Sequence, residues 1–548
     1  MKHLCIIICL IMLIPAGAAA QIIGGSTEYT RADTLRGSLR PERSYDVLKY
    51  HLRLKLNPEK QYISGSNTIT FMVPESLPVM QVDLFENMQV DSILFRDHSL
   101  DYTREHNAVF IEFEDPLKPG TVDSLRFYYS GNPIVAKNAP WDGGLVFSQD
   151  KNGNPFIATA VQGTGASLWY PNKDHQSDEP EEALIEVAVP NGLMNVSNGR
   201  FIGKEDLGNG YTRWSWKVSS PINNYSIALN IADYVHFQDK FRNLDLNYYV
   251  LPYNLEKAKE QFAEVKPMME CFYEKLGEYP FVKDGFKLVE TPYLGMEHQS
   301  AVAYGNQYMN GYLGRDLSGT GIGLKWDFII IHESAHEWFG NSITAKDIAD
   351  MWIHEGFTTY AETIYIECRW GKEKALEYLK GIRKNISNES PIIGDYGVNS
   401  AGSGDMYYKG ANLLNTIRSI YDNDSLWWNT MKDYVSTYRH QIIDTKTTEE
   451  FFDRATPVDL RPVFDQYLRH ASLPELQFKE EGDNILFRWK ADVENFKMPV
   501  DVLANGKEIR LNATSQWKDF PGEDHDLEDI EIVEEEFYIT TNLPEKED

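Results

Sequence analysis

Residues 326–340 read Trp-Asp-Phe-Ile-Ile-Ile-His-Glu-Ser-Ala-His-Glu-Trp-Phe-Gly. The apolar run that leads into the two histidines predicts a buried helix that faces a core. Residues four apart in a helix lie one turn apart on the same face, so His332 and His336 can reach the same metal ion. Glu333 would project beside that ion, where a carboxylate can serve as a general base.

A third metal ligand is predicted in residues 348–357, the next segment with helical character. Glu355 stands there, nineteen residues after His336. A His-His-Glu set leaves the fourth position of a zinc ion open for water, which distinguishes a catalytic zinc from a structural one. A bare H-E-x-x-H occurs by chance in unrelated helices, so this glutamate makes the prediction specific. We therefore predict one zinc ion per chain, while cobalt or manganese can occupy the same ligands.

Segments on both sides of these ligands extend the pattern. Residues 332–341 read His-Glu-x-x-His-x-Trp-Phe-Gly-Asn, and residues 350–357 read Asp-x-Trp-x-x-Glu-Gly-Phe. Residues 294–298 read Leu-Gly-Met-Glu-His, and residues 407–410 read Tyr-Tyr-Lys-Gly. In this order the chain resembles the zinc aminopeptidases of the aminopeptidase N type (gluzincins). The last two segments resemble the G-A-M-E-N exopeptidase motif and the Y-x-K-G segment of that family.

The resemblance implies a hydrolase that removes the N-terminal residue from peptides. Glu333 would take the proton of the attacking water and pass it to the leaving nitrogen. Tyr407, the tyrosine two residues before the lysine of Y-x-K-G, would donate to the carbonyl oxygen as negative charge develops there. Tyr408 is the neighbouring candidate for this role.

The resemblance also implies a binding site for the free amino group of the substrate. Glu297 would bind this cation, because a fixed carboxylate suits it and positions the first peptide bond over the metal. Gly295 and Met296 would lie along the substrate as a strand edge. Gln162 would be a second anchor, since it precedes a Pro-x-x-Asp segment, residues 171–174, by the family's nine residues.

Some residues depart from the family pattern, and others are expected to hold the metal ligands in place. Leu294 replaces the first glycine of G-A-M-E-N and is expected to change the wall of the first pocket, and His298 replaces its asparagine. His354 adjoins Glu355, and a helix would point it away from the metal. Glu362 and Asp350 are expected to orient the metal ligands through hydrogen bonds.

Two other functions remain open at this point. A zinc endopeptidase of the thermolysin type shares the His-His-Glu site, but Glu297 would close the cleft on one side. A non-catalytic peptide-binding scaffold would be expected to lose a metal ligand or the base, and this chain keeps them all.

Composition limits the partners. The chain has 548 residues, of which 42% are hydrophobic and 25% charged, as in soluble globular proteins of several domains. A net charge of −29 disfavours nucleic acid and anionic membrane surfaces as partners. The family resemblance implies peptides with a free N-terminus as the partners. The sequence does not give the oligomeric state.

The N-terminus resembles a secretory signal. An apolar run of residues 4–14 is too short to span a bilayer, and an A-x-A site predicts cleavage after residue 20. The mature chain would have no membrane span and would be periplasmic or secreted. It would keep only Cys271 and Cys368, which can pair, but their helical surroundings favour buried free thiols.

The pattern of apolar residues divides the rest of the chain. Residues 21–43 are polar and irregular and are expected to be a flexible lead-in. From residue 48 to residue 56 every second residue is apolar, and such alternation to about residue 235 predicts an all-β N-terminal domain over 44–235. A mostly α, thermolysin-like zinc catalytic domain is implied for 236–472. Returning strand patterns predict a small C-terminal β-sandwich over 473–548.

Overall fold

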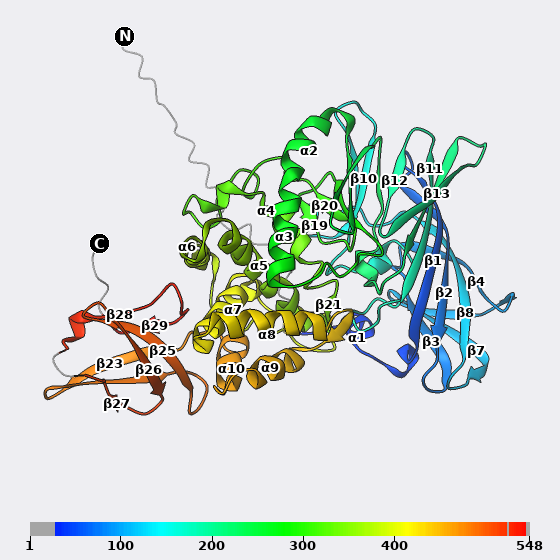
Figure 1. The fold of residues 1–548 in the computed structure, drawn as a ribbon. Helices are drawn as coiled ribbons and strands as arrows, with labels where there is room; N and C mark the ends of the chain where they lie inside the picture. The colour runs from blue at the N-terminus through cyan, green and yellow to red at the C-terminus, as the bar shows by residue number, and fades with distance from the viewer. Residues whose placement is uncertain (1–27, 523–524, 544–548) are drawn as a thin grey trace, which may run out of the picture.

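The computed structural model describes residues 28–522 and 525–543. Along the chain, a strand-rich N-terminal region is followed by a mostly helical middle region and then by a small region of strands (Figure 1). The predicted fold class, an all-β domain, a mostly α domain and a small β-sandwich, is confirmed. The predicted signal peptide, residues 1–20, lies outside the described residues.

The largest sheet of the N-terminal region has eight strands. The predicted alternation is present in its strand β1 (Asp46–Asn57), where the even-numbered residues from Tyr50 to Leu56 are buried. Leu48 departs from the pattern, because the pairing shifts register after Val47, and Val47 takes the buried position instead. The sheet order is β13 (Arg200–Asp206), β14 (Tyr211–Val218), β11 (Glu182–Pro190), β1, β2 (Tyr62–Met72), β8 (Val122–Gly131), β4 (Met88–Phe95) and β5 (His98–Ser99).

Two smaller sheets complete the N-terminal region. The second of them carries the strand that leads toward Gln162. One has the order β3 (Leu77–Asp83), β7 (Ala108–Leu117) and β6 (Tyr102–Glu105); the other has the order β12 (Met194–Val196), β15 (Asn230–Ala232), β10 (Pro155–Ala160) and β9 (Gly144–Gln149).

Residues 28–43, expected to be part of a flexible lead-in, instead form helix α1 (Arg31–Gly37) and a 3-10 turn. The prediction is wrong here because Thr30 and Asp33 form a capping box, which satisfies the free backbone N–H groups at the start of the helix. The buried guanidinium of Arg43 then pairs with a carboxylate of strand β3. These contacts hold the segment on the N-terminal sheets.

The middle region begins with a mixed sheet whose edge strand borders the cavity described below. Strand β19 (Gly295–Met296) pairs on one side only, with β20 (Val302–Tyr304). The sheet order is β16 (Val235–Phe241), β17 (Leu244–Val250), β18 (Phe286–Glu290), β20 and β19.

Helix α5 (Trp352–Trp370) is the centre of the helical part. Every residue from Trp352 to Ile366 is buried, because α3, α4, α6 and α7 pack around it. The other helices are α2 (Leu255–Gln261), α3 (Val265–Lys275), α4 (Phe328–Ala335), α6 (Lys372–Ile382), α7 (Tyr408–Tyr421), α8 (Asp424–Thr437), α9 (Thr445–Arg454) and α10 (Arg461–Arg469). The short strands β21 (Ile343–Ala345) and β22 (Gln441–Ile443) pair with each other in parallel.

Two small sheets form the C-terminal region, at the end of the molecule opposite the N-terminal sheets (Figure 1). One sheet has the order β27 (Lys518–Asp519), β24 (Asn484–Lys490), β23 (Glu475–Glu481) and β29 (Thr540–Thr541). The other has the order β26 (Lys507–Thr514), β25 (Lys497–Ala504) and β28 (Ile530–Ile532). Helices α7 and α10 contact β25, which joins this region to the helices.

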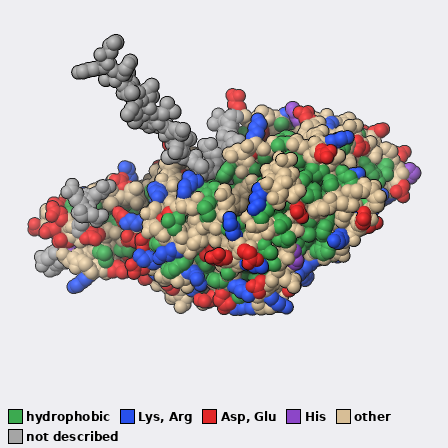
Figure 2. Space-filling model, turned by 90° about the horizontal axis from the view of Figure 1, so that it is seen from above, with side chains coloured by type: hydrophobic (Ala, Val, Ile, Leu, Met, Phe, Trp, Pro, Cys, Tyr) green, Lys and Arg blue, Asp and Glu red, His purple; other side chains and the backbone are tan. Residues whose placement is uncertain are grey.

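Charged side chains of both signs are scattered over the face seen in Figure 2. On the face seen in Figure 2, Lys and Arg side chains lie among Asp and Glu side chains and do not gather into a separate basic patch. No helix within residues 28–522 and 525–543 is long and apolar enough to cross a membrane.

Cys271 and Cys368 form a disulfide, with 5.9 Å between their Cα atoms. The prediction of two buried free thiols is therefore wrong. Helix α3 packs against the C-terminal part of α5, so the two cysteines meet although 97 residues separate them in sequence. The disulfide ties α5 to α3.

Replacing Cys368 by serine is expected to lower the free energy of unfolding by about 2–4 kcal/mol, because the cross-link restricts the unfolded chain. Urea unfolding without reductant measures this change. Reduced wild-type protein should unfold at the urea concentration of the Cys368→Ser variant, and equal stability of the variant and the oxidised wild type would contradict the expectation.

Candidate active site

Helix α4 presents the two predicted metal-binding histidines to the interior. Asp327 begins the helix, since its side chain accepts hydrogen bonds from the backbone N–H groups of Ile329 and Ile330. His332 lies in the last turn of α4, and His336 follows the helix in helical conformation. The predicted helix and the shared face of the histidines are therefore present.

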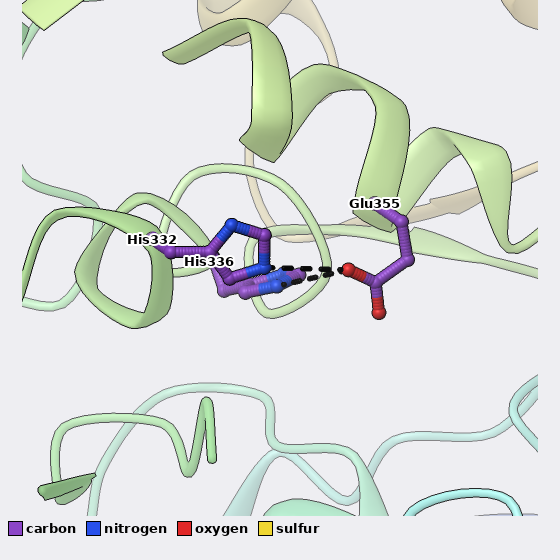
Figure 3. Close-up of side chains that lie close together, drawn as sticks. All are labelled: His332, His336 and Glu355. Carbon is purple, nitrogen blue, oxygen red and sulfur yellow. Dashed lines mark ion pairs between the residues drawn. The ribbon is translucent and has the colours of Figure 1, made fainter. Parts of the chain in front are cut away.

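The side chains of His332, His336 and Glu355 converge (Figure 3). Glu355 Oε2 lies 3.6 Å from His332 Nε2 and 3.3 Å from His336 Nε2, and all three side chains are buried. This oxygen has no hydrogen-bond partner among the described residues. The arrangement brings three donor atoms around one point.

The other nitrogen of each histidine is already occupied. His332 Nδ1 lies 2.6 Å from Glu362 Oε1, and His336 Nδ1 lies 2.9 Å from the backbone oxygen of Phe339. These contacts hold the rings so that both Nε2 atoms face Glu355. Two imidazole nitrogens and one carboxylate oxygen are ligands that zinc prefers, so the residues fit a zinc ion.

The carboxylates of the site are buried beside the two imidazole groups. Burial alone would raise the pKa of Glu355, but the imidazole groups of His336 and His332 lower that pKa well below its ordinary value. Burial raises the pKa of Glu333 to about 7; His332 opposes the rise and the nearby carboxylate of Glu297 adds to it. A carboxylate with a pKa near neutrality is suited to take and return a proton.

Glu297 lies at one end of this group. Its carboxylate accepts hydrogen bonds from Gln162 Nε2 and, at 3.2 Å, from the hydroxyl of Tyr225. One of its carboxylate oxygens lies within 4.8 Å of ligand atoms of Glu333 and His336. The structure thus brings Gln162 and Glu297 together, although 135 residues separate them.

Strand β19 passes close to helix α4 at Gly295. A Cβ atom at this position would lie 2.8 Å from Ile329 Cγ2 and 2.9 Å from Glu333 Oε1, so a side chain here would have to displace those two side chains. Met296, the next residue of the strand, is buried and lines the same cavity.

Tyr407 and Tyr408 both line the cavity, at the start of α7. The Tyr407 ring lies 6.3 Å from the His332 ring, centre to centre. Burial raises the pKa of Tyr407, and the adjacent carboxylate of Glu355 raises it further, so the hydroxyl keeps its proton. Burial raises the pKa of Tyr408 as well, and the nearby carboxylate of Glu362 raises it further.

Of the two residues expected to support the metal ligands, only Glu362 contacts one. Its second oxygen accepts a hydrogen bond from the Tyr378 hydroxyl at 2.7 Å. Asp350 instead accepts hydrogen bonds from Tyr396 and Thr445, so the prediction for Asp350 is wrong. It lies at the end of the 3-10 turn, Ile348–Asp350, that precedes α5.

His298 and His354 are buried and are not part of the group of metal-binding atoms. His354 Nε2 accepts a hydrogen bond from the backbone N–H of Ala345 at 2.8 Å, which turns the ring away as expected. Neither nitrogen of His298 has a hydrogen-bond partner among the described residues, and burial lowers the pKa of His298 to about 3.

Three contributing residues were missed in the sequence. Tyr225 and Tyr378 carry no motif, and their distance in sequence from Glu297 and Glu362 follows no rule of helix or strand spacing. Asn341 belongs to the motif around His336; its side-chain amide donates to the backbone oxygen of Glu297 at 2.8 Å. Only Asn341 had a signal in the sequence.

The helical region is similar to a domain of known peptidases. Residues 253–467 match the Peptidase family M1 domain. The leucyl aminopeptidase of Saccharolobus solfataricus is 22% identical over 64% of this chain and 47% of its own length. Aminopeptidase B of Mus musculus is 24% identical over 87% of this chain and 77% of its own length. Residues 253–467 are therefore similar to the peptidase family M1 domain, and the predicted resemblance to aminopeptidase N-like proteins is confirmed.

Solved structures show the same fold. The M1 zinc metallopeptidase from Deinococcus radiodurans has a TM-score of 0.65 and 19% sequence identity, and the match covers 78% of this chain and 94% of that chain. The match to the leucyl aminopeptidase, and the one to a probable aminopeptidase 1 of Sulfurisphaera tokodaii, span about half the length of those proteins.

Glu362→Gln is expected to weaken zinc binding about 10–100-fold, because the amide is a weaker acceptor for His332 Nδ1–H. Competition with a chelator at fixed pH measures the affinity. Asp350→Asn is the matched control, because Asp350 touches none of the ligands, and its zinc affinity is expected to equal that of the wild type. Equal losses in both variants would contradict the role of Glu362.

Proposed function

We propose that this chain is a zinc-dependent aminopeptidase that removes the N-terminal residue from peptides with a free α-amino group. One observation carries the proposal. The carboxylate of Glu297, held by Gln162 and Tyr225, lies in the same cavity as Glu333 and the three metal-binding side chains.

The three converging donors would hold the metal. Zinc bound to His332, His336 and Glu355 would supply Lewis-acid activation of the carbonyl and of the attacking water. Glu333, which lines the same cavity as the three metal-binding side chains, would take the proton of the water and then deliver it to the leaving nitrogen. Tyr407 donates its hydroxyl proton in a hydrogen bond to the carbonyl oxygen as that oxygen gains negative charge.

Glu297 determines which bond is cut. A protonated α-amino group that binds this carboxylate brings the first peptide bond beside Glu333, because the two carboxylates are close together. The edge of β19 has no strand partner on the cavity side, so the extended peptide can lie along Gly295 and Met296. The cation is recognised at the end of the cavity, and cleavage therefore removes a single residue.

The endopeptidase alternative shares the metal site but gives no role to the buried group formed by Glu297, Gln162 and Tyr225. A chain that extends past this point would leave the carboxylate of Glu297 buried without a cation, which is costly. The non-catalytic alternative gives no role to Glu333 as a general base or to Tyr407 as a hydrogen-bond donor to the carbonyl oxygen. Both alternatives have distinct outcomes in the following test.

The purified zinc-loaded chain is expected to hydrolyse a panel of aminoacyl fluorogenic amides and to lose this activity with a chelator. Glu333→Gln should lower kcat/KM by roughly 10²–10⁴-fold, because the general base is lost. Glu297→Ala should lower it by about 10–100-fold, because the charged hydrogen bond to the amine is lost. Initial rates over a range of substrate concentrations measure both effects.

N-acetylated peptides provide the control on the position of cleavage. They should resist the enzyme, and the exposed-site variant Glu59→Ala should behave as the wild type. Cleavage of N-acetylated peptides at internal bonds would favour the endopeptidase, and binding of zinc without cleavage of any peptide would favour the scaffold.

Tyr225→Phe is expected to lower kcat/KM about tenfold, mainly through a higher KM, because it removes one hydrogen bond that orients Glu297. Tyr234→Phe is the matched control, since this buried hydroxyl donates to the backbone of Glu290 and not to the site. Steady-state kinetics on one free-amine substrate compare the two, and equal effects would show that the loss is only structural.

We also propose that the mature protein is exported. The signal-like sequence of residues 1–20 and the disulfide between Cys271 and Cys368 support this, because disulfides persist in oxidising compartments. N-terminal sequencing of the protein recovered after expression in a bacterial host with intact export should begin at Gln21 in the periplasm. Retention of the whole chain in the cytoplasm would contradict export.

A further inference from the structure

The cavity beside Glu333 has a second, apolar wall that the proposed reaction does not use. This downstream wall is formed by Leu294, Tyr312, Leu317, Phe328, Ile329 and Tyr408. Phe328 lies one turn before His332 on α4, and its ring stacks on the His332 ring at 5.1 Å between centres. The Tyr312 ring packs edge-on against Phe328 at 5.4 Å. The wall is therefore a continuous aromatic surface that reaches the metal site.

The direction of strand β19 places this wall beyond the cut. Glu297 follows β19 and binds the amine, while Leu294 precedes it, three residues away. Residues in a strand advance about 3.3 Å each, so Leu294 lies roughly 10 Å from Glu297 along the strand. A peptide anchored at Glu297 and extended along this edge runs toward Leu294, so the side chains past the bond beside Glu333, beginning with that of the second residue, face this wall.

The first side chain would meet a different part of the cavity. Met296 packs with Ala158 and Ala160 of β10 and with Tyr293, so it lies toward the N-terminal region. Leu294 and Phe328 belong instead to the core of the helical region. The first and second side chains of the peptide, on either side of the cut, would therefore contact separate sets of residues.

Charge strengthens the selectivity of the cavity. The described residues that line it include four glutamates, Glu297, Glu333, Glu355 and Glu362, and neither a lysine nor an arginine. An acidic side chain on the second residue of the substrate would meet no lysine or arginine among these lining residues and would be repelled by the glutamates. A large apolar side chain would bury its surface against aromatic rings.

We propose that Leu294, Tyr312 and Phe328 select the second residue of the peptide and favour a large apolar or aromatic side chain there. The inference rests on the proposed aminopeptidase reaction and adds the identity of the residue that follows the cut. Leu294 contributes to this preference, because a glycine at this position would remove a buried side chain from the downstream wall.

The test uses tripeptides that share the first residue and differ only in the second, such as Ala-Phe-Ala, Ala-Leu-Ala, Ala-Gly-Ala and Ala-Glu-Ala. Mass spectrometry of the remaining tripeptide gives kcat/KM for each with the zinc-loaded full chain. We expect phenylalanine and leucine to exceed glycine by about tenfold or more, and glutamate to be the poorest. Equal values across the panel would overturn the inference and leave the proposed function intact.

Variants then assign the preference to the wall. Leu294→Gly and Tyr312→Ala should reduce the ratio of kcat/KM for Ala-Phe-Ala over Ala-Gly-Ala toward one, and Tyr312→Phe should retain it. The ratio within each variant is independent of how much protein folds. Tyr102→Ala, at an exposed tyrosine of β6, is the control and should keep the wild-type ratio. An unchanged ratio in Leu294→Gly and Tyr312→Ala would overturn the assignment.

Binding separates failure of this inference from failure of the proposed function. If no tripeptide is cut, calorimetry with the zinc-loaded Glu333→Gln variant measures affinity for the same peptides. Tighter binding of Ala-Phe-Ala than of Ala-Gly-Ala and Ala-Glu-Ala would support the wall as a selective surface even though the reaction was absent. Equal affinities would overturn it.

Discussion

A single carboxylate held between two imidazole rings is the interaction on which the site depends. Glu355 comes from α5, and the two histidines come from α4 and the residue after it, so the donors meet only while these helices pack together. Glu362 lies seven residues after Glu355, two turns along the same face of α5, and reaches His332 from behind. One face of one buried helix thus provides both a ligand and the support of another ligand.

The end of the cavity depends on the contact between the N-terminal region and the helical region. Gln162 and Tyr225 come from the strand-rich region, while Glu297 follows the edge strand of the next sheet. The backbone of Glu297 is fixed in turn by Asn341, just beyond the histidine motif. Each region alone therefore has only part of the residues that would bind a substrate amine.

Local patterns in the sequence predicted most of the fold and the centre of the site. The spacing of His332 and His336 and the alternation in β1 are direct consequences of helix and strand periods, and both are present. The family resemblance added Glu297, Gln162 and Tyr407, all of which line the cavity. Residues without a period or a motif could not be found in this way: Tyr225 lies in a 3-10 turn, Asn224–Ser226, and contacts Glu297 across 72 residues of sequence.

The errors have the same origin. Asp350 shares a motif with Glu355, but it precedes the helix, and a shared motif does not say which way a side chain points. The cysteine pair depends on the contact of α3 with α5, and helix α1 depends on a two-residue cap within a polar segment. In each case a tertiary or capping contact decides the structure, and neither composition nor a local motif predicts such a contact.

The buried end of the cavity has a kinetic consequence for the proposed reaction. After one cut, the released amino acid still occupies the carboxylate of Glu297, and the new amine of the shortened peptide is one residue, about 3.3 Å, short of it. In the proposed reaction the peptide cannot advance to Glu297 until the amino acid has left that carboxylate. Such an enzyme works distributively: it releases each shortened peptide before the next round, so a ladder of intermediates that differ by one residue accumulates in solution.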